Sequence, residues 1–496
     1  MSDEETTALN EVERGTHSTA RAVATNTLSG TVGRLLGGVF GAATVAVTSR
    51  ALGAEGYGTY ATVLAFFFLW AAVADGGFYQ ILVRDLGRPK ADQSTLLGAA
   101  IALRAGLLTV LLATGFGVFL LIPRYDDLQI LGVIAAATYI PLSFGQLLMA
   151  VFQKHLTIHR AAAAEVAARA AQFLGAWLLF RYAANDPKSF LWLLLAATVL
   201  HTTLLIFATR GLITQRIRLS RTAMRGMLRE AFPVGIAILF TITYFRLDTV
   251  MLSLMKTSED VGIYNLAYKL LEQLIFFPAA LMGLLTPMLA NAYVADRRRF
   301  TLLSGHAGRI IAALAAPMLI GGWFLADPLV VLLGGDAFAA AAAPLRILLI
   351  ATVLIFAGTL LGGLVVITGR QRRALPVYVI AMLINVALNV IFIPKYSYFG
   401  AAWATVITEL FVDAGLLWVL LRGGIASRPP RLLRIVAAAA VMGVPLLLFS
   451  EILITALGVW SLAVFLVLCP LVYVGALLAL KGISREELAL LRQRGA

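Results

Sequence analysis

Residues 344–366 read PLRILLIATVLIFAGTLLGGLVV, a continuous apolar run in which Arg346 is the only charge. An α-helix rises about 1.5 Å per residue, so about 20 such residues cross the roughly 30 Å of hydrocarbon in a bilayer. Runs of this kind recur along the whole chain. They predict an all-α polytopic membrane protein with about 14 transmembrane helices, at 28–50, 59–82, 95–122, 129–151, 161–182, 189–209, 232–254, 262–288, 304–325, 344–366, 376–394, 400–421, 432–452 and 457–480.

The composition favours the bilayer as the solvent of most of this surface. Of the 496 residues 60% are hydrophobic and 13% are charged, whereas a soluble domain carries about 25% charged residues. The net charge is +14, but the arginines fall between apolar runs, so we assign them to membrane topology and expect no nucleic-acid partner. The polar segment 1–27 lacks the apolar core of a signal peptide.

Lysine and arginine predict the orientation of the spans. With the N-terminus placed in the cytoplasm, about 22 of these residues fall in cytoplasmic loops and about 6 in external ones, as the positive-inside rule requires. We therefore expect a protein of the cell inner membrane with cytoplasmic N- and C-termini. The lysine and arginine residues in the external loops are Arg50, Arg124, Arg181, Lys188, Lys256 and Lys395.

A short motif repeats at an offset of 204 residues. Glu55-Gly-Tyr-Gly-Thr-Tyr60 matches Glu259-Asp-Val-Gly-Ile-Tyr264 at its Glu, Gly and second Tyr. Each copy follows the first helix of a six-helix block, which predicts two lobes in parallel repeat. The expected order is a cytoplasmic tail (1–27), an N-lobe with helices one to six (28–209), a basic cytoplasmic linker (210–231), a C-lobe with helices seven to twelve (232–421), helices thirteen and fourteen (422–481) and a cytoplasmic tail (482–496).

Two smaller segments also carry expectations. The region 326–343 is apolar but broken by glycines, so we expect a loop and a short interfacial helix there. Ser484 and Glu487 form a capping-box pattern that predicts a short amphipathic helix over 484–494.

Seven stretches together carry a resemblance to a known family, at 49–60, 74–77, 82–84, 246–252, 261–264, 267–270 and 394–402. They resemble bacterial polysaccharide flippases of the O-antigen type, in the multidrug/oligosaccharidyl-lipid/polysaccharide exporter superfamily. The resemblance implies translocation of an undecaprenyl-diphosphate-linked oligosaccharide from the cytoplasmic to the periplasmic leaflet, with polysaccharide polymerase machinery as a further partner. A multidrug or organic-cation antiporter of the same superfamily and a lipid II flippase remain alternatives.

Charged residues inside the spans are the candidate functional residues, because each one costs about 2.5–3.5 kcal/mol at the bilayer centre unless it has a partner or water. Most are cations, and arginine binds phosphate oxygens through a planar fork. We expect a cationic central cavity that works by alternating access and holds the diphosphate. Its candidate residues are Arg34, Arg104, Arg169, Arg246, Asp248 and Lys269.

Some of these charges also fit a purely structural role. Arg169 lies four residues from Glu165, and Lys269 lies three from Glu272, so each pair can also be an ion pair within its own helix. Arg34 and Arg346 lie near span ends, where the side chain can extend to the interface.

Acidic residues in the spans are candidates for coupling transport to H⁺ or Na⁺. Glu409 and Asp413 share one helical face, and Asp75 lies near the inner end of the second span. Alternatively, Glu409 and Asp413 form a salt bridge to an arginine on a neighbouring helix.

The sequence contains no phosphate-binding glycine loop, metal-spaced His/Cys set or nucleophile elbow. We therefore expect a transporter without a cofactor and not an enzyme. A polytopic glycosyltransferase or polymerase is a further alternative, which the short external loops disfavour.

Overall fold

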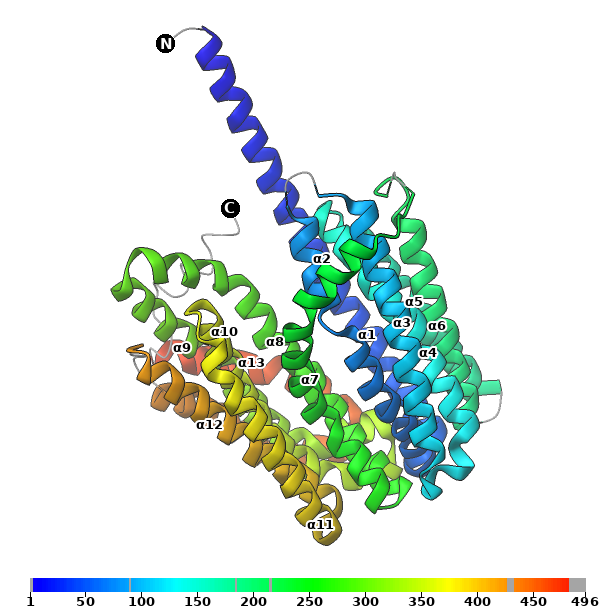
Figure 1. Cartoon of the computed structure of the whole chain (residues 1–496). Coiled ribbons are helices and arrows are strands. Elements are labelled where there is room, and N and C mark those ends of the chain that lie inside the picture. The colour runs from blue at the N-terminus through cyan, green and yellow to red at the C-terminus, as the bar shows by residue number, and fades with distance from the viewer. Residues whose placement is uncertain (1–2, 89–90, 183–184, 214–215, 426–431, 481–496) are drawn as a thin grey trace. The chain divides into compact units, whose positions relative to one another are not determined.

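The computed structural model describes residues 3–88, 91–182, 185–213, 216–425 and 432–480. Secondary structure in these ranges is helical throughout (Figure 1). The α-helices are α1 (Asp3–Asp75), α2 (Phe78–Leu86), α3 (Gln93–Leu120), α4 (Gln129–Lys154), α5 (Ile158–Tyr182), α6 (Pro187–Ala208), α7 (Arg221–Met255), α8 (Ser258–Ala295), α9 (Arg297–Gly334), α10 (Ala342–Ile367), α11 (Gln371–Arg422), α12 (Leu432–Leu457) and α13 (Ser461–Ala479), with 3₁₀ helices η1 (Pro123–Leu128), η2 (Asp336–Ala341) and η3 (Gly458–Trp460).

The helices agree with fourteen membrane spans, because α1 and α11 each contain two. Gly53 in α1 has φ 64° and ψ −177°, and Ser397 in α11 has φ 50° and ψ −132°, so neither residue continues a helix. Ten segments of the described chain are long and apolar enough to cross a membrane, and two of these are the broken double helices. The charged α5 and the long α7 complete the set, which confirms a polytopic all-α membrane protein.

The chain divides into two compact units. Unit 1 comprises Met1–Leu52 and Thr62–Ile242, and unit 2 comprises Gly53–Ala61 and Thr243–Ala496. Residues 53–61 contain the first copy of the repeated motif, so this copy groups with unit 2 and with the second copy on α8.

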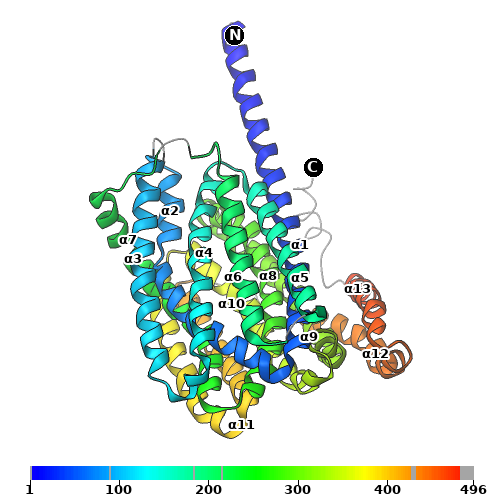
Figure 2. The ribbon, with the colours of Figure 1, turned by 90° about the vertical axis from the view of Figure 1, so that its right-hand side faces the viewer.

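Unit 1 is a bundle in which α3, α4, α5 and α6 run side by side (Figures 1 and 2). One apolar cluster joins Phe78 and Leu82 of α2 to Leu97 of α3, Leu147 of α4 and Met227 of α7. At its edge Arg84 of α2 forms an ion pair with Glu230 of α7. This hydrogen-bonded ion pair lowers the pKa of Glu230.

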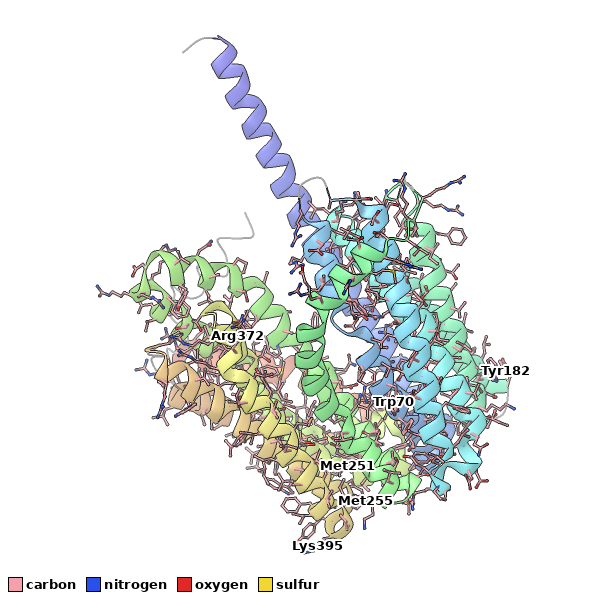
Figure 3. The ribbon with its side chains drawn as sticks, viewed as in Figure 1. Trp70, Tyr182, Met251, Met255, Arg372 and Lys395 are labelled. Carbon is pink, nitrogen blue, oxygen red and sulfur yellow. The ribbon has the colours of Figure 1, made fainter. Side chains whose placement is uncertain are left out.

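Unit 2 has its main core between α8, α9, α10 and both halves of α11, around side chains such as Met282, Ile311, Phe356 and Leu416. A second apolar cluster packs α12 and α13 against α9 (Figure 2). In this cluster the hydroxyl of Tyr473 donates to the carbonyl of Ala313 at 2.8 Å. Figure 3 shows the first half of α11 extending from Arg372 at one end to Lys395 at the other. Next to Lys395, the carbonyl of Pro394 accepts a hydrogen bond from Lys256 Nζ at 2.9 Å.

Three sequence expectations differ from the structure or lie outside it. The predicted loop at 326–343 is wrong for its first half, because α9 continues through Pro328 to Gly334 before the short helix η2. The predicted span 59–82 is broken by Gly76 and Gly77, which have φ of 52° and 77°. The amphipathic helix expected at 484–494 lies outside the described residues.

Candidate functional site

Arg104 is the most deeply buried cation in the described part of unit 1, with 1% of the residue exposed. Its Nη1 forms an ion pair with Asp75, Nε donates to Ser143 Oγ at 2.5 Å, and Nη2 donates to Gln146 Oε1 at 2.7 Å. Two sequence candidates, one for substrate and one for ion coupling, therefore bind each other. The guanidinium group of Arg104 is therefore occupied by side chains of α1 and α4.

A cavity of about 590 Å³ lies inside unit 1, between the end of α1 and helices α4, α5 and α6. Its wall includes Arg169 and Glu165 of α5, which lie 3.5 Å apart as an ion pair. Gln146, the acceptor from Arg104, also lines it. The other polar side chains of the wall are Thr138, Tyr139, Gln172, Thr198 and His201.

This cavity therefore combines one compensated charge pair with amide, hydroxyl and aromatic groups. Such a wall suits a neutral polar ligand with many hydroxyl groups better than a bare anion, because Glu165 offsets the charge of Arg169. The sequence alone did not identify Gln146, Gln172 or Tyr139, because uncharged polar residues in a span are most often interhelical hydrogen bonds.

The second cluster lies in unit 2, where Arg246 of α7 meets α8. Arg246 forms an ion pair with Glu272 and lies over the ring of Tyr268, 5.7 Å from its centroid. Lys269 binds the other oxygen of Glu272 at 2.8 Å. The side chains of Arg246, Lys269 and Glu272 are 17%, 33% and 26% exposed, so two cations share one carboxylate at a partly accessible place.

The remaining acidic candidates of unit 2 are buried. Asp248 is 1% exposed and accepts hydrogen bonds from the hydroxyl of Tyr264 and from the backbone N–H of Thr249, the latter at 2.7 Å. On α11, Glu409 and Asp413 are 3% and 9% exposed. Oδ1 of Asp413 is buried and accepts no hydrogen bond from any described residue.

Arg34 lies on α1, and its side chain is outside the described part of the structure. Arg346 on α10 forms an ion pair with Asp327 of α9 and donates to the carbonyl of Trp323 at 3.1 Å. Of the predicted site residues, Arg104 therefore pairs with Asp75, and Arg246 and Lys269 both pair with Glu272. Arg169 lines the separate cavity of unit 1.

This fold is similar to those of solved flippase and transporter structures. A structure described as "Lipid II flippase MurJ, inward closed conformation" matches with a TM-score of 0.74 and 15% identity, over 90% of this chain and 97% of that one. An inward-facing multidrug resistance MATE family transporter matches with a TM-score of 0.62 and 15% identity, over 78% and 94%. A transporter from Pyrococcus furiosus, described as having a binding pocket of reverse polarity, matches with a TM-score of 0.58 and 15% identity, over 81% and 95%.

Family comparison agrees with these structures. No curated protein sequence matches the chain. The family described as MatE matches residues 233–391, and the family described as polysaccharide biosynthesis protein matches residues 23–292, which is more than half of the chain. The chain therefore belongs to the polysaccharide biosynthesis protein family and has the transporter and flippase fold of the multidrug/oligosaccharidyl-lipid/polysaccharide exporter superfamily.

Proposed function

We propose that the protein flips an undecaprenyl-diphosphate-linked oligosaccharide from the cytoplasmic to the periplasmic leaflet of the inner membrane by alternating access. The observation that carries the proposal is the cluster of Arg246, Lys269 and Glu272. Two cations that share one carboxylate in a membrane segment can exchange part of that pairing for phosphate oxygens, which bind arginine through two parallel hydrogen bonds.

The unit 1 cavity supports the sugar part of the same proposal. Its neutral polar wall offers hydrogen bonds to hydroxyl groups, and the Glu165–Arg169 pair adds no net charge. An organic-cation antiporter needs an uncompensated acidic site for its substrate, whereas Glu272 in this partly exposed cluster is already paired with Arg246 and Lys269.

We further propose that ion coupling acts at Glu409 and Asp413. Asp75 is less suited to this role, because it is paired with Arg104. Oδ1 of Asp413 is buried and accepts no hydrogen bond from a described residue, so its lone pairs can bind a proton or coordinate a cation.

Complementation of a strain that lacks its own O-antigen flippase tests the proposal. Wild-type protein should restore surface polysaccharide, measured on gels of cell envelopes, and Arg246→Gln and Lys269→Gln should reduce it while the amount of protein in the membrane stays unchanged. Arg346→Gln is the matched control, because Arg346 also pairs with one carboxylate on a neighbouring helix. Full restoration by the Arg246→Gln, Lys269→Gln double variant contradicts the proposed role of the cluster.

Complementation of two further strains distinguishes the alternative functions. Rescue of a strain depleted of its lipid II flippase, without rescue of surface polysaccharide, would assign the protein to lipid II. Resistance to organic cations in a drug-sensitive strain, without either rescue, would assign it to drug export.

A further inference from the structure

The turn in the middle of α11 holds an unusual backbone. Ser397 has φ 50° and ψ −132°, a conformation that L-residues rarely adopt. Pro394 lacks the N–H that would continue the first half of the helix, and a Cβ at Gly400 would overlap with the backbone of Phe392. The two halves of α11 therefore reverse tightly around a strained serine, at a position where glycine would relieve the strain.

A cavity of about 790 Å³ lies beside this turn, entirely within unit 2. Small-molecule sites span about 300–1,000 Å³ and combine an apolar wall with a few polar groups. Ser397 lines the cavity, and its Oγ is buried with no hydrogen bond to any described residue.

Aromatic rings form most of the remaining wall. Tyr398 and Phe399 lie with ring centroids 4.7 Å apart, and Phe392 meets the edge of Tyr396 at 6.2 Å. Tyr396 and Trp403 are 60% and 44% exposed. Broad, rigid aromatic faces of this kind pack against the C–H faces of sugar rings at little cost in conformational entropy.

Two charged side chains of opposite sign line the same cavity, Asp260 at the start of α8 and Lys395 at the turn. A carboxylate accepts hydrogen bonds from neighbouring hydroxyls, and an ammonium donates to ring and hydroxyl oxygens. Together with the rings they form the set of groups that recognises a carbohydrate. An aromatic belt at the membrane interface would account for the exposed rings alone. It would not require a cavity, or two side chains of opposite charge such as Asp260 and Lys395 beside the rings.

We propose that this cavity is a saccharide-binding site that holds a sugar unit of the glycolipid on the external side, after the headgroup has crossed. This assignment rests on the proposed function and on the orientation that places Lys395 outside the cytoplasm. The site retains the sugars at the exit, opposes their return, and makes release depend on the aromatic rings around the α11 turn.

Saturation-transfer NMR tests the site directly. The full chain in nanodiscs is mixed with the methyl glycosides of glucose, galactose and N-acetylglucosamine as probes. Wild-type protein should transfer saturation to the ring protons of at least one probe, and Tyr396→Ala and Trp403→Ala should each lose this transfer. Tyr182→Ala is the matched control, since Tyr182 is also an exposed tyrosine at a predicted external helix end but lies in unit 1.

Transfer to none of the probes, or equal transfer in the wild type and both cavity variants, overturns the proposal. If Tyr396→Ala lowers the amount of protein in the membrane while saccharide binding persists, the rings belong to the bilayer interface, which also overturns it. Saccharide binding without rescue of surface polysaccharide would remove the proposed function and leave the site standing. Rescue without binding would remove only the site.

Discussion

Gly58 and Gly262, the glycines of the two copies of the repeated motif, cross each other in direct backbone contact within unit 2. The contact is reciprocal. A Cβ at Gly58 would overlap with the carbonyl of Ser258, one turn before Gly262, and a Cβ at Gly262 would overlap with the carbonyl of Ala54, one turn before Gly58. The two copies therefore meet as equivalent halves of one symmetric helix crossing, in the way small residues bring membrane helices together.

This crossing predicts that neither glycine tolerates a methyl group. Gly58→Ala and Gly262→Ala should each destabilise the protein by about 1–3 kcal/mol through overpacking against a carbonyl. Thermal unfolding of the detergent-purified protein should show a lower midpoint for both. Gly106→Ala is the control, because a Cβ at Gly106 in α3 meets no atom within 4 Å. Unchanged unfolding midpoints in both glycine variants would contradict the prediction, because the two helices could then move apart with no loss of stability.

The buried pair of Arg104 and Asp75 predicts a large coupling energy. Removal of one partner leaves the other charge buried, which typically costs about 3–5 kcal/mol, whereas neutralising both costs less. Arg104→Gln and Asp75→Asn should each lower the unfolding midpoint more than the double variant does. A different result would revise the site: if Arg104→Gln keeps wild-type stability and loses only transport, Arg104 contacts substrate directly.

The helical spans could be predicted from the sequence because span length and loop charge are local properties. The ion pairs Glu165–Arg169 and Lys269–Glu272 were also open to prediction, since residues three or four apart share a helix face. The positions where helices are interrupted or continue were harder to predict from the sequence. Gly76 and Gly77 interrupt a run that is apolar enough to continue, and α9 passes through Pro328 where a loop was expected.

Partners from different helices could not be predicted from the sequence. Arg104 and Asp75 are 29 residues apart, and Arg246 and Glu272 are 26 apart, so only the packing of the bundles decides that they meet. The repeated motif predicted two related six-helix blocks but not the contact between its two glycines. Its two glycines are 204 residues apart, and the shared pattern of Glu, Gly and Tyr was the signal that related them.

The unit 1 cavity predicts a dependence on the sign of one added charge. Gln172 lines the cavity next to the compensated pair of Glu165 and Arg169. Gln172→Glu makes the cavity net negative and should repel a substrate that carries a diphosphate, while Gln172→Lys of similar size should not. Surface polysaccharide in the complemented strain should fall for the glutamate variant and remain for the lysine variant. Equal loss in both would indicate a steric effect, and loss in the lysine variant alone would point to a cationic substrate.

The excess of arginine in the linker predicts the orientation of the chain, and a cysteine assay can test it. The only cysteine is Cys469, so Cys469→Ala provides a background without thiols. In this background Arg216→Cys and Lys395→Cys each place one thiol at an exposed position. A membrane-impermeant maleimide should label Lys395→Cys in intact spheroplasts and Arg216→Cys only in inside-out vesicles, because basic loops stay on the cytoplasmic side. The reverse pattern would invert the protein and place the cavity at the α11 turn on the cytoplasmic side, where it would receive sugars and not release them.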